Sequence, residues 1–483
     1  MPVEYSRGLR LGAKATGRAE SELEAALEAS RVVVSADSRM PRGVLTLRVL
    51  LTTMRRGPGR LVLERGDLAT SELDAIEEAV HAVDLERPLS VVRRVHGDVT
   101  VRLHVGPDCD RGVRLVPEGF GAHVAGQRSA VIRPRRPGNA IGAVFTAALG
   151  AAEAFKLTAA VLPARRVLHR HLRFCPLTLT PDLDRAPELP VDLVFDLALM
   201  GVGAIGTGIV LVLQAMDGTG RILLVDRQRF AAENLGTYSI GTAADVVAGP
   251  WKVDLAREAL PRFDVVRFCG AVGELPEAID AGRVPWFRTV LTALDTPEAR
   301  RDAQRQWPDR LIDAATGDTV LGIHAYEHGG RCMFCVFPPE RTGPSAAERL
   351  AEATGLSVAR AMRGDDPLTK ADLQELTPKE RARLERHLGE PVCGLGAALG
   401  LTALDARAYQ PSIPFVSLEA GCLAMARLVA HALAIPTTSN LVQYDALVGP
   451  QRLIIDQMDR LPGCTCQTRA AAIEQVRARR ARG

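Results

Sequence analysis

A glycine-rich stretch, Gly201-Val-Gly203-Ala-Ile-Gly206, limits the folds that are open to this chain of 483 residues. It follows the strand pattern VDLVFDLALM and precedes an apolar helix pattern, and Asp226 ends the next apolar run, twenty residues beyond Gly206. Glycines at this spacing allow a tight turn and a close approach of backbone to phosphate, and a helix N-terminus adds unpaired N–H groups. The pattern predicts a β-α-β nucleotide-binding unit in which Asp226 accepts hydrogen bonds from ribose hydroxyls. The alternative is a glycine-rich turn that serves packing only.

The composition is that of a globular protein with balanced charge. The chain is 47% hydrophobic and 24% charged, and its formal net charge is +3. This balance gives no reason to expect nucleic acid as a partner. The basic end QVRARRARG is expected to be a solvated or frayed tail.

The sequence favours neither secretion nor a membrane span. The N-terminus has no apolar core and no small-residue cleavage site, so no signal peptide is expected. Leu197 to Met216 is uncharged and long enough to cross a membrane, but glycines interrupt it and Asp196 and Asp217 flank it. A buried strand followed by a helix explains this segment better. With only nine cysteines, the chain is expected to be a protein of the reducing cytoplasm.

The order of expected elements divides the chain into two α/β halves, residues 1–190 and 191–483. Both halves open on strand, helix and strand patterns, but only the second has the glycine fingerprint, so the first is interpreted as a degenerate, inactive repeat. The linker Pro176–Pro190 separates them. A charged segment, about residues 338–412, indicates a helical insertion, after which Ile413–Leu433 is predicted to be a strand followed by a long apolar helix. The predicted fold class is therefore α/β, a Rossmann-like domain joined to a degenerate α/β half.

Two charged residues beyond Asp226 favour chemistry at a phosphate over hydride transfer. Lys252 lies in GPWK, and Asp295 ends the strand pattern TVLTALD. An attack on the α-phosphate of ATP needs a cation at the phosphate oxygens, a role for Lys252, and Mg²⁺ at the leaving pyrophosphate, a role for Asp295. Each residue by itself could be a surface charge. The fingerprint alone also fits an NAD-dependent oxidoreductase, which stays an alternative.

Four cysteines form two close pairs, Cys332 with Cys335 and Cys464 with Cys466. Four thiolates make a closed tetrahedral zinc site whose role is structural rather than catalytic. A dithiol redox centre is the alternative for the first pair.

The motifs together resemble the ubiquitin-activating enzyme superfamily, which includes ThiF, MoeB and HesA. The resemblance covers roughly residues 191 to 467 and rests on GVGAIG, VDRQRFAAENLGTY, GPWK, TALDTPEARR, CMFC and CTC. Members adenylate the C-terminal glycine carboxylate of a ubiquitin-like protein with MgATP. The resemblance implies that the three glycines cradle the nucleotide, Asp226 holds the ribose, Asn234 and Lys252 contact phosphates, and Asp295 binds magnesium. Arg300 closes the last of these motifs and is expected to be structural.

The chain departs from the family pattern in the loop after Asp226. Gln228 stands at the second acid, Thr237 at the phosphate-binding arginine, and Tyr238 at the glutamine. Threonine cannot replace a bidentate guanidinium donor. The N-terminal stretch EYSRGLRL is similar to a family helix whose arginine reaches the partner's nucleotide site, and Arg7 would match that arginine. A solvated basic residue is the alternative for Arg7.

The resemblance also implies what the chain acts on. The expected acceptor is a small ubiquitin-like or sulfur-carrier protein, with a conjugating protein as a possible further partner and with the chain as a monomeric pseudo-dimer or a homodimer. Cys393, in GEPVCGLG, is the candidate for receiving the acyl group as a thioester, and a buried small hydrophobic residue is its alternative. A nucleotide-binding scaffold without activity is the second alternative function, motivated by Thr237.

Overall fold

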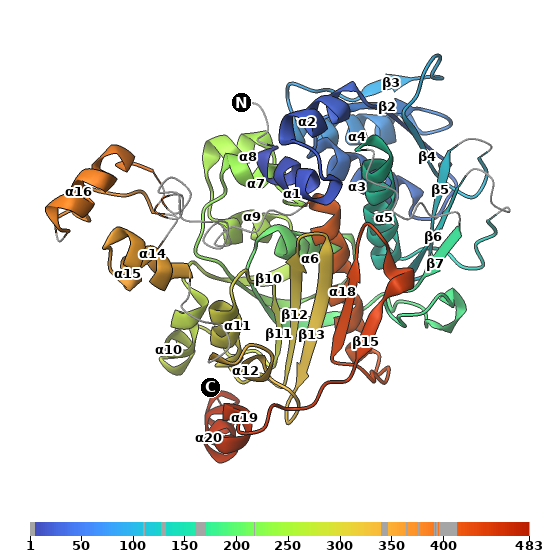
Figure 1. Cartoon of the computed structure of the whole chain (residues 1–483). Coiled ribbons are helices and arrows are strands. Elements are labelled where there is room, and N and C mark those ends of the chain that lie inside the picture. The colour runs from blue at the N-terminus through green and yellow to red at the C-terminus, as the bar shows by residue number, and fades with distance from the viewer. Residues whose placement is uncertain are drawn as a thin grey trace.

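The computed structural model describes residues 5–109, 112–126, 132–159, 171–216, 218–339, 346–363, 366–374, 376–390, 392, 395 and 413–482. Within these residues, two mixed sheets surrounded by helices form the body of the protein (Figure 1). The helices of the body are α1 (Ser6–Thr16), α2 (Glu20–Ala29), α3 (Gly43–Arg55), α4 (Thr70–Val83), α5 (Ala140–Thr158), α6 (Ala204–Ala215), α7 (Ala232–Leu235), α8 (Ala243–Ala248), α9 (Lys252–Glu258), α10 (Leu275–Asp280), α11 (Pro297–Gln304), α12 (Met333–Val336), α18 (Pro414–Ala432), α19 (Thr465–Thr468) and α20 (Ala470–Arg480).

The first sheet has seven strands in the order β3-β2-β1-β4-β5-β6-β7. The first five strands along the chain run parallel, and β6 and β7 are antiparallel to their neighbours. Its strands are β1 (Arg31–Ala36), β2 (Arg60–Glu64), β3 (Ser90–Val92), β4 (Val101–Val105), β5 (Val113–Glu118), β6 (Gly121–Ala125) and β7 (His171–Phe174).

The second sheet has eight strands in the order β10-β9-β8-β11-β12-β13-β14-β15. It is parallel from β10 to β12 and antiparallel beyond. Its strands are β8 (Val194–Met200), β9 (Thr219–Val225), β10 (Phe263–Phe268), β11 (Thr289–Thr292), β12 (Arg310–Gly317), β13 (Val320–Glu327), β14 (Leu441–Asp445) and β15 (Ile454–Asp456). The order third, second, first, fourth to seventh is therefore the same in both sheets, and the predicted α/β class is confirmed.

Four long apolar helices pack together between the sheets. Helix α3 packs on α5, α6 packs on α18, and α5 packs on α18 (Figure 1). Along the chain, α5 comes between the sixth and seventh strands of the first sheet. Helix α18 likewise comes between the sixth and seventh strands of the second sheet. The largest apolar core accordingly takes side chains from both halves of the chain.

Two of these helices are long and apolar enough to cross a membrane by composition alone. They are α5 and α18, and 89% and 83% of their apolar windows are buried inside the protein. Burial of this extent is typical of core helices. The uncharged segment Leu197–Met216 forms the end of β8, the glycine loop and α6, as the sequence predicts.

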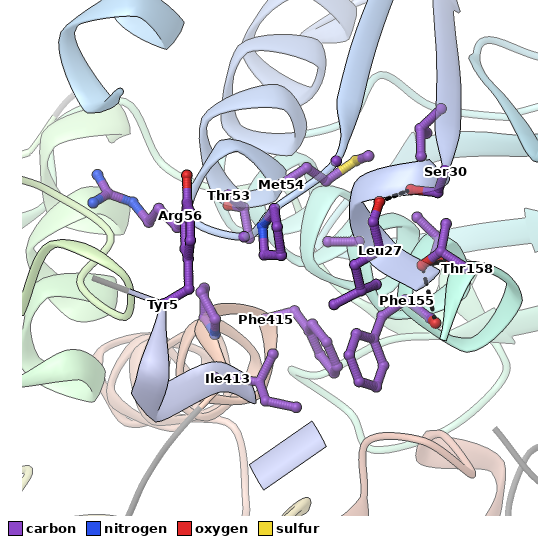
Figure 2. Close-up of a pocket in the computed structure, with 18 of the residues that line it drawn as sticks. Tyr5, Leu27, Ser30, Thr53, Met54, Arg56, Phe155, Thr158, Ile413 and Phe415 are labelled. Atoms are coloured by element: carbon purple, nitrogen blue, oxygen red, sulfur yellow. Dashed lines mark hydrogen bonds between the residues drawn. The ribbon is translucent and has the colours of Figure 1, made fainter. Parts of the chain in front are cut away.

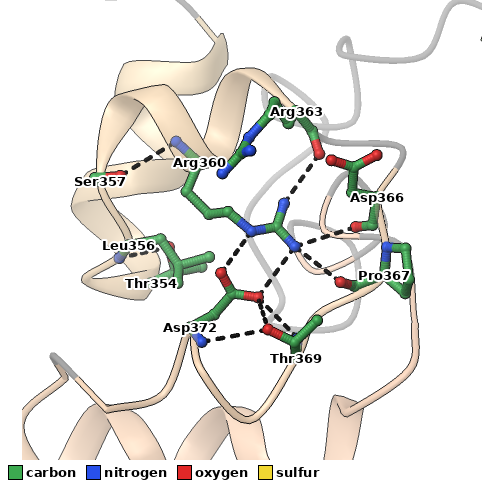
Figure 3. Close-up of polar contacts among 9 residues, drawn as sticks. All are labelled: Thr354, Leu356, Ser357, Arg360, Arg363, Asp366, Pro367, Thr369 and Asp372. Atoms are coloured by element: carbon green, nitrogen blue, oxygen red, sulfur yellow. Dashed lines mark hydrogen bonds and ion pairs between the residues drawn. The ribbon is translucent and has the colours of Figure 1, made fainter.

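The insertion forms a small helical lobe at the side of the body (Figure 1). It contains α14 (Ala346–Thr354), α15 (Val358–Met362) and α16 (Pro378–Leu384), which share an apolar core of their own. Arg360 holds the lobe together by a bidentate ion pair with Asp372, with Nε–Oδ1 2.6 Å and Nη2–Oδ2 3.1 Å (Figure 3). Its Nη2 also donates to the carbonyl of Pro367 at 2.8 Å.

Two sequence-based expectations are wrong. The segment from Ile413 has no initial strand, because α18 begins at Pro414, and a short apolar run cannot be assigned to strand or helix by periodicity alone. The basic C-terminal segment is not a frayed tail within the described residues. Helix α20 is anchored by Arg477, which donates to the carbonyl of Pro308 at 2.9 Å, and by Arg480, which binds Asp280 at 2.8 Å.

Candidate functional site

The predicted glycine loop lies at the carboxyl edge of the second sheet, between β8 and α6. Gly201 has φ +91°, and a Cβ there would lie 2.4 Å from the carbonyl oxygen of Ala293. A Cβ at Gly206 would lie 2.1 Å from the carbonyl oxygen of Gly201. Both positions therefore require glycine, since backbone atoms cannot move aside. Gly203 is the N-cap of α6, and the nearest atom to a Cβ there is the Tyr238 hydroxyl at 3.9 Å.

Asp226 is half-buried beside this loop, at the end of β9. Its Oδ2 accepts a hydrogen bond from the backbone N–H of Val202 at 2.8 Å, and its Oδ1 accepts one from the backbone N–H of Gln228 at 2.8 Å. A carboxylate has about four acceptor positions, so each oxygen keeps capacity for a ribose hydroxyl. The arrangement ties the strand tip to the glycine loop and is compatible with the predicted ribose contact.

The next segment turns Asn234 and Thr237 inward. Asn234 is buried, and its Oδ1 accepts from the backbone N–H of Ala231 at 3.0 Å, which caps α7. A phosphate contact by Asn234 would therefore fall to its NH2 group. Thr237 is also buried, and its hydroxyl donates to the carbonyl of Asn234 at 3.3 Å. Thr237 thus serves the turn and presents no cation at the position where the motif resemblance leads one to expect an arginine.

Lys252 and Tyr238 meet near Gly203 of the glycine loop. Lys252 is buried at the start of α9, its ammonium lies 5.1 Å from the centre of the Tyr238 ring, and it also contacts the side-chain oxygen of Gln228. Burial raises the pKa of the Tyr238 phenol, and the positive charge of Lys252 opposes this rise. The phenol therefore stays protonated. The structure brings Lys252, Tyr238, Asp226 and Gly203 into one cluster.

Arg7 reaches the same region from the first half. It lies on α1, and its Nη2 is 3.5 Å from Oε1 of Glu233 on α7. Its positive charge, like that of Lys252, opposes the rise that burial causes in the pKa of the Tyr238 phenol. The N-terminal helix therefore lies against α7 of the second half, although more than two hundred residues separate Arg7 from Glu233 in the sequence.

Asp295 follows β11 and is exposed. The N–H of Ala293, two residues earlier, donates to the carbonyl of Met200 at 2.9 Å, so the segment of Asp295 runs beside the glycine loop. Arg300 binds protein groups: its Nη2 donates to the carbonyl of Leu294 at 2.7 Å, and its Nε lies 3.5 Å from Oδ1 of Asp313.

Sequence reasoning missed Asp313. This residue is fully buried on β12 and also accepts from the Thr292 hydroxyl at 2.6 Å. Through Arg300 it braces the segment that carries Asp295. An acid inside the apolar run RLIDAA was the available signal, because an ionised side chain is rarely buried without a partner.

The four predicted zinc ligands lie together on two helical turns. Cys332 precedes α12, Cys464 precedes α19, and all four Sγ atoms lie within 4.8 Å of one another. The Sγ–Sγ distances are 3.7 Å for Cys332–Cys335, 3.7 Å for Cys332–Cys464 and 3.6 Å for Cys335–Cys466. Tetrahedral zinc with bonds of about 2.3 Å separates its sulfurs by about 3.8 Å. The four thiols therefore fit a zinc ion, and their closeness favours a metal site over an isolated dithiol.

Cys393 lies outside the described residues. Its neighbours Val392 and Leu395 are both fully buried in the core of the helical lobe. The thioester role of Cys393 stays a prediction.

Comparison with known proteins finds a relative that matches part of the chain, and solved structures of low sequence identity. No family model matches the chain. The uncharacterized protein y4jF of Sinorhizobium fredii is 28% identical over 239 residues, which are 48% of this chain and 41% of that protein. The chain thus matches less than half the length of this relative.

Among solved structures, the chain is similar to E. coli MccB with ATP, at 12% identity and a TM-score of 0.36, and to MccB in complex with N-formylated MccA, at 13% identity and a TM-score of 0.36. Each of these matches covers 74% of this chain and 98% of the MccB chain. A likeness this low does not identify the family of the chain.

Proposed function

We propose that the second half binds MgATP and adenylates the C-terminal carboxylate of a small protein or peptide. A ubiquitin-like or sulfur-carrier protein is the acceptor that the motif resemblance implies. The observation that carries the proposal is the cluster of the glycine loop, Asp226 and Lys252 at the carboxyl edge of β8 and β9, where open α/β sheets bind their ligands. The cysteine thiols and the buried core helices are compatible with the cytoplasm as its location.

In the proposed reaction a carboxylate oxygen of the acceptor attacks the α-phosphorus of ATP. The bond between the α-phosphorus and the oxygen that bridges it to the β-phosphate breaks, and pyrophosphate leaves with the electron pair. The N–H groups at the start of α6 would hold phosphate oxygens, Lys252 would balance their charge, and Asp226 would orient the ribose. Asp295 is the carboxylate that would hold Mg²⁺, and the ion would supply positive charge at the leaving pyrophosphate.

The acyl adenylate can then pass its acyl group to a thiol. In that step the thiolate attacks the carbonyl carbon and AMP leaves, which gives a thioester. Cys393 is the proposed thiolate on the basis of its sequence context. A reducible adduct with the acceptor that persists in Cys393→Ala would contradict this assignment.

The missing loop arginine favours one other function, a nucleotide-binding scaffold without activity. Thr237 is turned inward, so the loop lacks the cation that the family places there. ATP–pyrophosphate exchange separates the two functions. The purified chain is tested with Mg²⁺ and ATP, first with small proteins ending in Gly-Gly that are encoded beside its gene, and then with short peptides.

Exchange that depends on the acceptor, and that is lost in Asp295→Ala, would support adenylation. ATP binding without exchange under any acceptor would support the scaffold. Binding of NADH in preference to ATP would instead favour the oxidoreductase that the fingerprint alone suggests.

A further inference from the structure

Arg56 of the first half reaches the loop of the second half that follows Asn234. It is the residue directly after α3, and its guanidinium extends away from the neighbouring apolar cavity toward the segment of α7 and α8 (Figure 2). The cavity itself encloses about 90 Å³. Tyr5, Met54 and Phe415 are among the residues that line it.

The guanidinium of Arg56 holds both ends of one loop. Its Nη1 donates to the carbonyl of Leu235 at 2.7 Å, and its Nη2 donates to the carbonyl of Gly241 at 3.1 Å. Leu235 is the last residue of α7, and Gly241 has φ +94° just before the cap of α8. Thr237 and Tyr238 lie between these two carbonyls, so the loop is fixed on both sides of them.

Burial of this cation is costly. Arg56 is only 4% exposed, and among the described residues no carboxylate lies within ion-pair distance of it. Burial lowers the pKa of Arg56 to about 9. A buried charge without an opposite charge is destabilising unless its hydrogen bonds serve a specific arrangement.

We infer that Arg56 is a positioning residue that holds the loop from Leu235 to Gly241 in the arrangement needed for nucleotide binding. The inference rests on the proposed function of the second half. It also assigns a role to the half without a glycine fingerprint, whose side chains support the site of the other half as a partner subunit would in a dimer. Tyr238, which touches Lys252 and faces Gly203, is the loop residue that depends on this support.

The neighbouring arginine provides a matched control. Arg55 is 1% exposed and also donates to backbone carbonyls, those of Gly57 at 3.1 Å and Gly59 at 2.9 Å. Both acceptors lie in the first half. Arg55→Lys and Arg56→Lys each keep a cation but lose the planar fork that binds two carbonyls at once, so both are expected to destabilise the chain to a similar degree.

The experiment measures two quantities on the full chain. The first is the Kd of the chain for α,β-methylene-ATP in the presence of Mg²⁺, measured by calorimetry. The second is amide hydrogen exchange of residues 232–242. We expect Arg56→Lys to weaken nucleotide binding about tenfold and to speed exchange in this segment, because one or both loop hydrogen bonds are lost. Arg55→Lys should lower the Tm but leave both quantities at their wild-type values.

Two results would overturn the inference. One is faster exchange in Arg56→Lys with an unchanged Kd, and the other is an equal loss of binding in both variants. A wild-type chain that binds no nucleotide would instead remove the proposed function. The exchange measurement would then decide on the loop contact alone: faster exchange confined to Arg56→Lys supports it, and unchanged exchange overturns it.

Discussion

The two sheets share a strand order but differ at their carboxyl edges. At the tip of β9, Asp226 accepts hydrogen bonds from the backbone of the glycine loop and of its own turn. At the corresponding tip of β2, Glu64 is 2.8 Å from Arg102 and also accepts from the N–H of Val95 at 2.7 Å. The acid of the first half is thus neutralised by a cation of its own sheet, whereas the acid of the second half is oriented by neutral donors.

The turns that follow the first strand of each sheet differ in the same way. Glycines form the turn after β8, whereas the turn after β1 contains Asp37 and Arg39, whose side chains are 3.4 Å apart, and ends at Arg42. The strand order therefore does not determine a binding site, because the site depends on a few loop residues carried by the sheet. The first half instead contributes Arg7 and Arg56 to the loop of the second half.

The largest expected effect tests whether only the second half performs chemistry. Lys252→Ala removes the buried cation beside Tyr238, and we expect acceptor-dependent ATP–pyrophosphate exchange to fall about 100- to 1,000-fold. Arg257→Ala, a half-exposed residue of the same helix, is the control and should retain wild-type exchange. Equal activity of the two variants would show that Lys252 is not at the phosphates.

The second prediction concerns the cysteine site, for which the first half has no counterpart among its described residues. Cys335→Ser should abolish the binding of one zinc ion per chain, measured by elemental analysis. It should also lower the Tm by several degrees, because a zinc ion there would join α12 to the segment of α19 and α20. Cys269→Ser, at an exposed cysteine, should leave both unchanged. A wild-type chain that contains no zinc would contradict the proposed metal site.

The third prediction concerns the contact between the halves. Glu419 on α18 is fully buried, and Tyr444 donates to its Oε2 at 2.6 Å. Burial raises the pKa of Glu419 from 4.5 to about 8. The hydrogen bond from Tyr444 and the charge of Lys156 lower this pKa, but the effect of burial is larger. The folded chain keeps this proton between about pH 4.5 and 8, whereas the unfolded chain loses it, so the free energy of unfolding should fall as the pH rises through this window.

Glu419→Gln tests the sign of this dependence. Glutamine keeps a hydrogen-bonding side chain of the same size but does not titrate. Urea unfolding at pH 5 and pH 8 should show a decrease on the order of 1–3 kcal/mol in the wild type and a smaller decrease in the variant. Equal slopes for both proteins would assign the pH dependence to other groups.

The features that the sequence predicted are those in which neighbouring residues carry the information. Short spacings along the chain identify the glycine loop with Asp226, and likewise each of the two cysteine pairs. Residues this close in sequence on one turn or at neighbouring strand tips must also lie close together in the fold. The role of Arg56 could not be predicted from local spacing, since 179 positions separate it from Leu235. Its acceptors are backbone carbonyls, which every residue has, so the residue types at the acceptor positions do not reveal the contact. The long helix after Ile413 was predicted, but its first turn was mistaken for a strand, because the helix is buried on all sides and lacks a polar stripe.

The smallest effect is expected at the turn of the first half that replaces the glycine loop. Arg42 has φ +61°, a left-handed conformation that costs a residue with a Cβ roughly 1 kcal/mol and costs glycine little. Arg42→Gly should therefore leave the Tm unchanged or raise it by a few degrees, with the gain limited by the entropy of glycine in the unfolded chain. MgATP affinity should not change, because this turn takes no part in the proposed site. Altered MgATP affinity in Arg42→Gly would mean that the first half also holds nucleotide, and the contrast between the two edges would have to be abandoned.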